Sequence, residues 1–280
     1  MNSQIKSIHI FYHSANKQAS LWAKKIKTWL RKEYPHVKLA DKDPAVVLIL
    51  GGDGSILEAV AKYGGKGSMI FGLNMGKIGF LASVREEERF IDSLRAVLEG
   101  KFNTIERMML RTAVKRSGKT VFHSEALNEV VVKNPLGMVE LRADVGDHPV
   151  QHVRGTGIMI STATGSTAYN LSAHGPIVMP DIKCMIITEL LDHDIPTPSV
   201  VVKYTNELSI NVINFKNRGL LSISKTKKAF DVLLVTDGET IFPLKKNDII
   251  IVKSSPKLIK FVQLEDNYFF RSLKEKFRFN

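Results

Sequence analysis

The sequence predicts an α/β N-terminal domain with a Rossmann-like parallel sheet, followed by a predominantly β, sandwich-like C-terminal domain. Up to about residue 100, apolar runs without polar alternation are separated by helical patterns, as in strands buried on both faces of a parallel sheet. From about residue 101, many short strand-like runs follow one another with turn residues between them. The chain of 280 residues is long enough for two domains, each with its own core.

The N-terminal domain, residues 1–100, alternates strands with helices. We expect strands at residues 7–12, 44–50 and 68–73. We expect helices at residues 19–33, 56–63 and 86–98, the last two closed by glycines at 64–65 and 100. A sheet of this kind binds ligands beyond the carboxyl ends of its strands.

The C-terminal domain, residues 101–265, reads as β structure. A hairpin is expected where residues 110–115 and 120–123 flank Arg116-Ser117-Gly118. Further strands are expected at residues 129–133, 139–145, 150–154, 157–161, 200–204, 208–213, 231–236 and 248–253. In the tail, residues 266–280, Phe269, Leu273 and Phe277 are spaced by four, which predicts a helix that packs back on the N-terminal domain.

Composition limits the classes of partner. The net charge of +12, from 40 basic and 28 acidic residues, favours anionic partners such as nucleotides. The lysines and arginines of residues 19–33 alternate with apolar residues at helical spacing, so we interpret them as a solvated helix face and not as a nucleic-acid arm. No stretch approaches the roughly 18 apolar residues of a membrane span, so we expect no membrane partner. A single cysteine, Cys184, suits a reducing cytoplasm and excludes an intrachain disulfide.

The most informative segment is the apolar run at residues 46–50, followed by Gly51-Gly52-Asp53-Gly54-Ser55 and a helical pattern. Glycines permit positive φ and the close approach of phosphate to backbone N–H groups, and a helix N-terminus adds further donors. A carboxylate there would repel phosphate unless it has a role. General base for a hydroxyl that attacks a phosphoryl group is one such role. The alternative is an Asp-Gly turn that only reverses the chain.

A second dense segment, residues 155–176, places glycines and small hydroxyl residues around one tyrosine. Tyr169 could stack on a base while Thr164 and Thr167 offer hydroxyl groups to its edge. The alternative is a Ser/Thr-rich loop that caps a helix beginning near Ala168. The residue types leave both interpretations open, because caps use the same side chains.

Taken together, five segments resemble the NAD kinase family, in order and at suitable spacing. They are Gly51-Gly52-Asp53-Gly54-Ser55, Asn74-Met75-Gly76-Lys77-Ile78-Gly79-Phe80-Leu81, Leu127-Asn128-Glu129-Val130, Thr164-Gly165-Ser166-Thr167-Ala168-Tyr169 and Asp237-Gly238. The Gly-Gly-Asp-Gly segment also occurs in diacylglycerol kinases, sphingosine kinases and 6-phosphofructokinases. The segment at residues 164–169 is specific to NAD kinases. The resemblance covers nearly the whole chain, including residues 273–277.

This resemblance implies transfer of the γ-phosphoryl group of ATP to the 2′-hydroxyl of the adenosine ribose of NAD, which gives NADP. It implies that Asp53 takes the hydroxyl proton and that Gly51, Gly52 and Gly54 cradle phosphates. The other NAD-binding residues that it implies are Phe80, Asn128, Glu129, Arg154, Thr156, Thr164, Thr167, Ala168, Tyr169, Asn170, Leu171, Ser172 and Glu239. The chain has no Walker lysine motif, so Mg²⁺ on the ATP phosphates is the expected source of positive charge.

The family also implies a homo-oligomer, because dimers and tetramers are usual in it and an arginine matching Arg154 is often supplied across a subunit interface. Three positions depart from the family pattern. Thr156 stands where aspartate is usual, His174 where a second glycine is common, and Glu239 where glutamine is frequent. These departures concern the nicotinamide end of the site and not phosphoryl transfer.

Three alternative functions can be distinguished from this one by a sequence feature or a simple measurement. A lipid kinase of the diacylglycerol type would use the same glycine-Asp turn but needs an apolar acyl groove, which the polar segment 164–172 disfavours. An NAD(P)-binding sensor with weak activity would keep the pocket, but the intact Asp53 turn argues for turnover. Nonspecific nucleic-acid binding would show as strongly salt-dependent binding to DNA.

Overall fold

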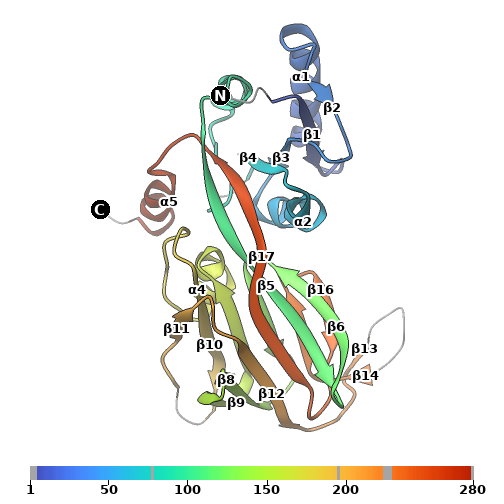
Figure 1. The fold of residues 1–280 in the computed structure, drawn as a ribbon, viewed down its shortest axis with the longest axis vertical. Helices are drawn as coiled ribbons and strands as arrows, with labels where there is room; N and C mark the ends of the chain where they lie inside the picture. Colours follow the sequence, from blue (N-terminus) through green and yellow to red (C-terminus); the bar gives the residue numbers. More distant parts are fainter. Residues whose placement is uncertain (1–4, 77–78, 194–195, 223–228, 279–280) are drawn as a thin grey trace. The chain divides into compact units, whose positions relative to one another are not determined.

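The computed structural model describes residues 5–76, 79–193, 196–222 and 229–278 (Figure 1). Its chain divides into two compact units, one formed by Met1–Arg107 with Leu258–Asn280 and the other by Met108–Lys257. We predicted domain boundaries at residues 100 and 265. In the structure, the boundaries between the units fall within strands β5 (Asn103–Arg116) and β17 (Ile249–Gln263). The C-terminal segment therefore belongs to the same unit as the N-terminus.

The first unit contains a parallel sheet in the order β2-β1-β3-β4-β17. Its strands are β1 (Ser7–Tyr12), β2 (Lys38–Leu39), β3 (Val46–Gly51) and β4 (Met69–Asn74), together with the end of β17. Every residue of β3 is buried, which explains its unbroken apolar sequence. The predicted α/β part is confirmed.

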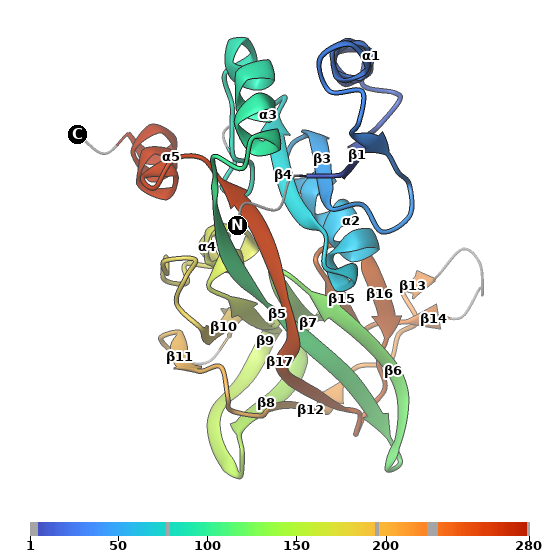
Figure 2. The same cartoon turned by 45° about the horizontal axis from the view of Figure 1, so that its top comes forward.

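Helices α1 (Lys17–Glu33), α2 (Asp53–Tyr63) and α3 (Phe90–Leu98) cover the faces of this sheet. The unit also contains α5 (Tyr268–Phe277) and the short 3₁₀ turns η1 (Gly64–Lys66) and η2 (Glu87–Arg89). The apolar faces of α1 and α3 join one core cluster with side chains of β1 and β3. In both views β1 and β3 lie between α1 and α2 (Figure 2). The helix expected in the tail is confirmed as α5.

The second unit is almost entirely antiparallel. Its path runs β16-β15-β7-β9-β8-β12-β17, with β10 and β11 attached to β9 and with β5 paired to β6 and β17. The strands are β6 (Lys119–Ala126), β7 (Glu129–Lys133), β8 (Val139–Val145), β9 (His148–Thr162), β10 (Cys184–Asp192), β11 (Val200–Lys203), β12 (Leu208–Phe215), β15 (Leu233–Thr236) and β16 (Thr240–Pro243). A small separate hairpin pairs β13 (Leu221–Ser222) with β14 (Ala229–Phe230). The predicted β-rich C-terminal part is confirmed.

Glycine explains the main error in the predicted strands. We expected two strands separated at Gly155 and Thr156, but β9 runs through both positions. A Cβ atom on Gly155 would lie 2.3 Å from the carbonyl oxygen of Leu191 in β10, and one on Gly157 would lie 2.2 Å from that of Val132 in β7. These glycines allow close neighbours in the middle of a sheet and do not form a turn.

Other differences are local. Strands β10 and β16 were not predicted, and Cys184 is buried at the start of β10, as expected of a small apolar residue. The predicted hairpin is confirmed, with Ser117 and Gly118 at positive φ between β5 and β6. No helix within the described ranges combines the length and apolarity needed to cross a membrane.

Candidate active site

Asp53 is the first residue of α2, directly after β3, so the helix begins earlier than the predicted residue 56. Its carboxylate is held by backbone groups of the segment after β4. Oδ2 accepts a hydrogen bond from the N–H of Phe80 at 3.0 Å, and Oδ1 accepts one from the N–H of Leu81 at 3.3 Å. Two backbone donors therefore set the orientation of the carboxylate, which is not the free side chain of a simple reverse turn.

Gly79 makes this approach possible. A Cβ atom at Gly79 would lie 2.2 Å from Oδ1 of Asp53, far inside van der Waals contact. The segment can reach the carboxylate only because position 79 has no side chain. Lys77 and Ile78, which belong to the same family motif, lie outside the described residues.

The glycines around Asp53 do not use their conformational freedom. None of Gly51, Gly52 and Gly54 is among the glycines at positive φ. A Cβ atom on Gly51 would lie 2.4 Å from Oγ of Ser55, so this glycine allows close packing of strand on helix. Nothing lies within 4 Å of a Cβ atom built on Gly52 or Gly54.

Neither strain nor packing within the chain therefore requires Gly52 and Gly54, and their small size leaves the adjoining backbone open. Helix α2 has no side-chain cap at its N-terminus. Its first-turn N–H groups and dipole then favour an anion. A phosphate group is the ligand that this combination of bare backbone and open helix end fits best.

Gly54→Ala tests this interpretation. Because position 54 lies in the first turn of α2 with room for a Cβ atom, we expect alanine to stabilise the free protein by about 0.5–1 kcal/mol. We also expect nucleotide affinity to fall at least about tenfold, because the methyl group would occupy the space of the phosphate. Urea unfolding and calorimetric titration with ATP measure the two effects. Thr28→Ala, at an exposed position of α1, should stabilise the protein without changing affinity. Equal affinity of the Gly54 variant would exclude a phosphate at this position.

A buried arginine accompanies Asp53. Arg107 of β5 is 7% exposed, and its guanidinium group lies 4.9 Å from the ring centroid of Phe261. Burial lowers the pKa of Arg107 to about 10, and the negative charge of Asp53 opposes that shift. The guanidinium group is thus charged at neutral pH, and it compensates the carboxylate of Asp53 in a poorly solvated environment.

Phe80 contributes its backbone to Asp53, while its side chain is buried beneath α5. The ring lies 5.9 Å from that of Phe269 and 6.5 Å from that of Phe277, and Nζ of Lys276 lies 4.8 Å from its centroid. The resemblance implied an adenine-side role for Phe80, but the structure places its ring in the packing of the C-terminal helix.

In the second unit, the side chain of Asp237 binds the backbone at the start of β7. Its carboxylate accepts hydrogen bonds from the backbone N–H groups of Leu127 at 2.7 Å, Asn128 at 2.8 Å and Glu129 at 3.2 Å. Asp237 and Gly238 both adopt positive φ in the turn between β15 and β16. Two motifs separated by more than a hundred positions are therefore joined by one carboxylate.

Asn128 and Glu129 place polar atoms in a buried environment. Among the residues that the structure describes, Oδ1 of Asn128 and Oε2 of Glu129 are buried without a hydrogen-bond partner. The backbone N–H of Tyr169 donates to the carboxyl group of Glu129. The Tyr169 ring is 37% exposed, and Nζ of Lys133 lies 5.6 Å from its centroid. Buried polar atoms and an accessible aromatic face together suit a ribose and a base.

Burial, aided by the nearby carboxylate of Asp237, raises the pKa of Glu129 to about 8. Burial also raises the pKa of Asp237, although its three backbone donors oppose that shift. Two carboxyl groups in one poorly solvated place cannot both ionise easily. At neutral pH Glu129 is mostly protonated and can donate as well as accept a hydrogen bond.

This arrangement predicts how stability depends on pH. The pKa of Glu129 is about 8 in the folded state against an ordinary 4.5, so the folded state binds the extra proton between those values. Stability from this group is complete below pH 4.5 and is lost as the pH rises toward 8, by a total on the order of 5 kcal/mol. Urea unfolding at pH 5 and pH 8.5 should therefore show a larger loss in the wild type than in Glu129→Gln. Equal losses would show that Glu129 is ionised throughout.

The loop after β9 is built largely by its own polar side chains. Within η3 (Thr164–Thr167), Oγ1 of Thr167 donates to the carbonyl of Thr164 at 3.3 Å. The amide of Asn170, which is fully buried in α4 (Tyr169–Ser172), donates to the carbonyl of Pro176 at 3.1 Å and accepts from Thr188 at 2.8 Å. No side chain caps α4, whose N-cap is Ala168. Thr167 and Asn170 thus shape the loop, whereas Tyr169 and Ser172 are exposed and Leu171 is half-buried.

Four further predicted or noted positions lie on β9 or in turns. Arg154 lies in β9 and lines a cavity of about 720 Å³ with Glu140 and Asn134. Thr156 also lies on β9, and its carbonyl accepts from the N–H of Asn134 at 2.8 Å. Glu239 is exposed in the turn after Asp237. His174 adopts a φ of 61°, a conformation that glycine favours, which matches the glycine common there in the family.

Sequence reasoning missed the positional roles of Gly79, Arg107 and Asp237. Gly79 and Asp237 lay within quoted motifs, but no local pattern showed that one clears space for Asp53 and the other fastens residues 127–129. Arg107 carried a usable signal. It alternates with Ile105 and Met109 in a strand, which places a charge on an apolar face.

Comparisons with known proteins agree with these motifs. A family model described as the ATP-NAD kinase N-terminal domain matches residues 3–102, and one described as the ATP-NAD kinase C-terminal domain matches residues 127–264. The NAD kinase of Geobacter metallireducens is 34% identical over 235 residues, covering 83% of this chain and 78% of the relative. That of Nitratidesulfovibrio vulgaris is 29% identical over 290 residues, covering 99% and 98%.

Two solved structures share the fold. A yeast NADH kinase complexed with NADH aligns with a TM-score of 0.86 at 18% identity, covering 99% of this chain and 89% of the other. An NAD kinase from Archaeoglobus fulgidus in complex with ATP aligns with a TM-score of 0.70 at 22% identity, covering 97% and 98%. Because the two family models together match most of the chain, and a relative above 30% identity covers more than four-fifths of it, the chain belongs to the ATP-NAD kinase family.

Proposed function

We propose that this chain transfers the γ-phosphoryl group of ATP to the 2′-hydroxyl of the adenosine ribose of NAD and releases NADP and ADP. The observation that carries the proposal is the setting of Asp53. Its carboxylate stands at an uncapped helix N-terminus, is oriented by two backbone donors and is flanked by glycines that leave the backbone bare. That combination suits proton removal beside bound phosphate.

Each unit has a part in this proposal. A ribose hydroxyl is a weak nucleophile, so transfer depends on positioning and on partial proton removal by Asp53 as the new O–P bond forms. The N–H groups at the start of α2 neutralise phosphate charge. Asn128, Glu129 and Tyr169 of the second unit are the proposed NAD-binding residues, and the exposed Tyr169 ring offers a face on which the base can stack.

Mg²⁺ fits this donor set as a companion of the nucleotide. The described part of the chain contains no group of three His, Cys, Asp or Glu residues arranged to hold a metal ion. Mg²⁺ commonly keeps several waters and is held by substrate phosphates with only one or two carboxylates. We therefore propose that Mg²⁺ arrives on the ATP phosphates, where it supplies positive charge to the transferred group.

The test is a coupled assay. Purified protein with NAD, ATP and Mg²⁺ should generate NADP, detected by an NADP-specific dehydrogenase, well above an Asp53→Ala control. Parallel reactions with NADH, with inorganic polyphosphate and with diacylglycerol identify the acceptor and the donor. NADP formation no faster than in the control would overturn the proposal, and phosphorylation of diacylglycerol alone would favour the lipid kinase alternative.

We further propose a cytoplasmic homo-oligomer, a dimer or a tetramer. Its support is the resemblance, in which an arginine matching Arg154 is often supplied across a subunit interface, together with the exposure of Arg154 on β9. A second copy could supply this guanidinium group. Light scattering on the purified protein measures the assembly, and a monomer with full activity would remove the reason for it.

A further inference from the structure

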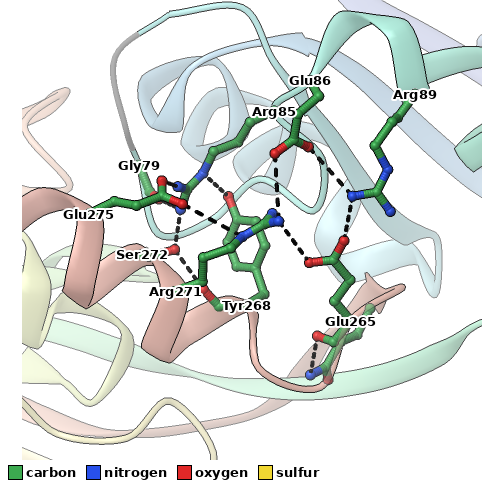
Figure 3. A network of polar contacts seen from close by, with 10 residues as sticks. Gly79, Arg85, Glu86, Arg89, Glu265, Tyr268, Arg271, Ser272 and Glu275 are labelled. Atoms are coloured by element: carbon green, nitrogen blue, oxygen red, sulfur yellow. Dashed lines mark hydrogen bonds and ion pairs between the residues drawn. The ribbon is translucent and has the colours of Figure 1, made fainter.

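The C-terminal helix α5 is joined to the segment after β4 through Arg85 (Figure 3). The side chain of Arg85 is only 10% exposed. Its Nε donates to the hydroxyl of Tyr268 at 3.1 Å, and its guanidinium carbon lies 4.8 Å from the Tyr268 ring centroid. The same group also bonds to Ser272 and Glu275. The largely buried side chain of Arg85 thus bonds to three residues of α5.

Arg85 also reaches the segment that holds Asp53. Its Nη2 donates to the carbonyl of Gly79 at 3.4 Å. Gly79 immediately precedes the two residues whose N–H groups bind the Asp53 carboxylate. A side chain anchored on α5 therefore contacts the backbone that orients the proposed base.

Two further sets of contacts fasten the helix at the same place. The ring of Phe80 packs against Phe269 and Phe277 of α5. Beyond them, Glu265 accepts from Arg89 at 2.6 Å and pairs with Arg271 at 3.1 Å, tying the start of α5 to η2 (Figure 3). Contacts with α5 and with Glu265, just before it, therefore hold both ends of the segment 79–89.

We propose that α5 is a latch that keeps residues 79–81 in the position needed to orient Asp53, and that Arg85 is the positioning residue through which the latch acts. This inference rests on the proposed phosphoryl transfer by Asp53. It assigns a role to a helix far from Asp53 in sequence, through contacts that run from α5 to Arg85 and Phe80, then to the backbone of residues 79–81.

The latch has a chemical consequence. The N–H groups of Phe80 and Leu81 set the direction of the Asp53 carboxylate, so their retreat would turn it away from the hydroxyl that it must reach. Among the described residues, Arg107 of β5 and Tyr268 of α5 also interact electrostatically with Asp53. Tyr268 is bonded to Arg85 as well, so a change at Arg85 should act on Asp53 through the backbone of residues 79–81 and through Tyr268.

Arg85→Gln is the test, in the coupled assay with NAD, ATP and Mg²⁺. We expect kcat to fall about 10- to 100-fold with little change in KM, because a small misplacement of a reacting group is enough for such a loss. Calorimetric titration should show ATP affinity largely kept, which separates a misplaced Asp53 from a damaged binding site. Arg95→Gln, an exposed arginine of α3 paired with Asp92, is the matched control and should change neither quantity.

Tyr268→Phe keeps the ring and removes only the hydroxyl that Arg85 binds, so it should lower kcat in the same way by less. Thermal unfolding checks that all variants are folded at the assay temperature. A fall in kcat matched by a loss of ATP affinity in folded Arg85→Gln would show a structural role only and overturn the proposal, as would unchanged kinetics. Failure of the proposed function is distinguishable, because the wild type would then form no NADP above the Asp53→Ala control.

Discussion

Asp53→Asn is expected to lower kcat by about 10²–10⁴-fold, the usual contribution of a general base. The amide cannot take the proton of the ribose hydroxyl, while its size and shape stay close to those of the carboxylate. It can still accept one of the two backbone hydrogen bonds from Phe80 and Leu81, so the helix start and its anion site persist. Steady-state kinetics and ATP titration together measure chemistry and binding.

The matched control is Asp92→Asn, the same change on an exposed carboxylate in the first turn of α3. It should leave kcat and KM unchanged. Near-normal kcat in Asp53→Asn would remove Asp53 from the role of base and leave it with a structural role in holding residues 79–81. A large loss of ATP affinity with unchanged kcat would lead to the same conclusion.

Gly79→Ala is the second change for which we expect a large effect. The new methyl group would lie 2.2 Å from Oδ1 of Asp53, so either the carboxylate or the segment must move. Movement of about 1 Å at a reacting group can lower the rate about 10²-fold. We expect a loss of that size in kcat, with ATP affinity largely kept because the start of α2 is unchanged.

Gly118→Ala separates this effect from general damage. Gly118 adopts a φ of +77° in the hairpin between β5 and β6, so alanine there should reduce stability by about 1 kcal/mol. It should not reduce kcat. If Gly79→Ala kept normal turnover, the contact between residues 79–81 and Asp53 would have no part in catalysis.

Local patterns were reliable where one strand or turn carried the whole signal. The apolar run of β3 and the glycines around Asp53 predicted a buried strand, a junction and a helix, and the structure contains all three in that order. The Ser117-Gly118 hairpin followed from turn chemistry alone. In these cases the conformation depends on residues close in sequence.

Patterns failed where the reason for a residue lay on another element. The sequence predicts a break between strands at Gly155 and Thr156, whereas Gly155 and Gly157 admit the backbones of β10 and β7 beside a continuous β9. The hydroxyl and amide groups of residues 164–170 fit both ligand contacts and a self-bonded loop, and several of them bond to the loop or to neighbouring strands. Single-sequence reasoning cannot tell a side chain that binds a ligand from one that satisfies its own backbone, because both use the same donors and acceptors.

The sequence by itself determined the fold class, the position of Asp53 after a buried strand, and the family to which its motifs belong. Only the tertiary structure showed that Gly79 leaves room for the Asp53 carboxylate, that Asp237 fastens Asn128 and Glu129, and that α5 packs on Phe80 and Arg85. The physical reason is how far apart along the chain the interacting groups lie. Strand and helix patterns arise from neighbours along the chain, whereas the orientation of a carboxylate and the protonation of a buried glutamate depend on groups that folding brings from far along it.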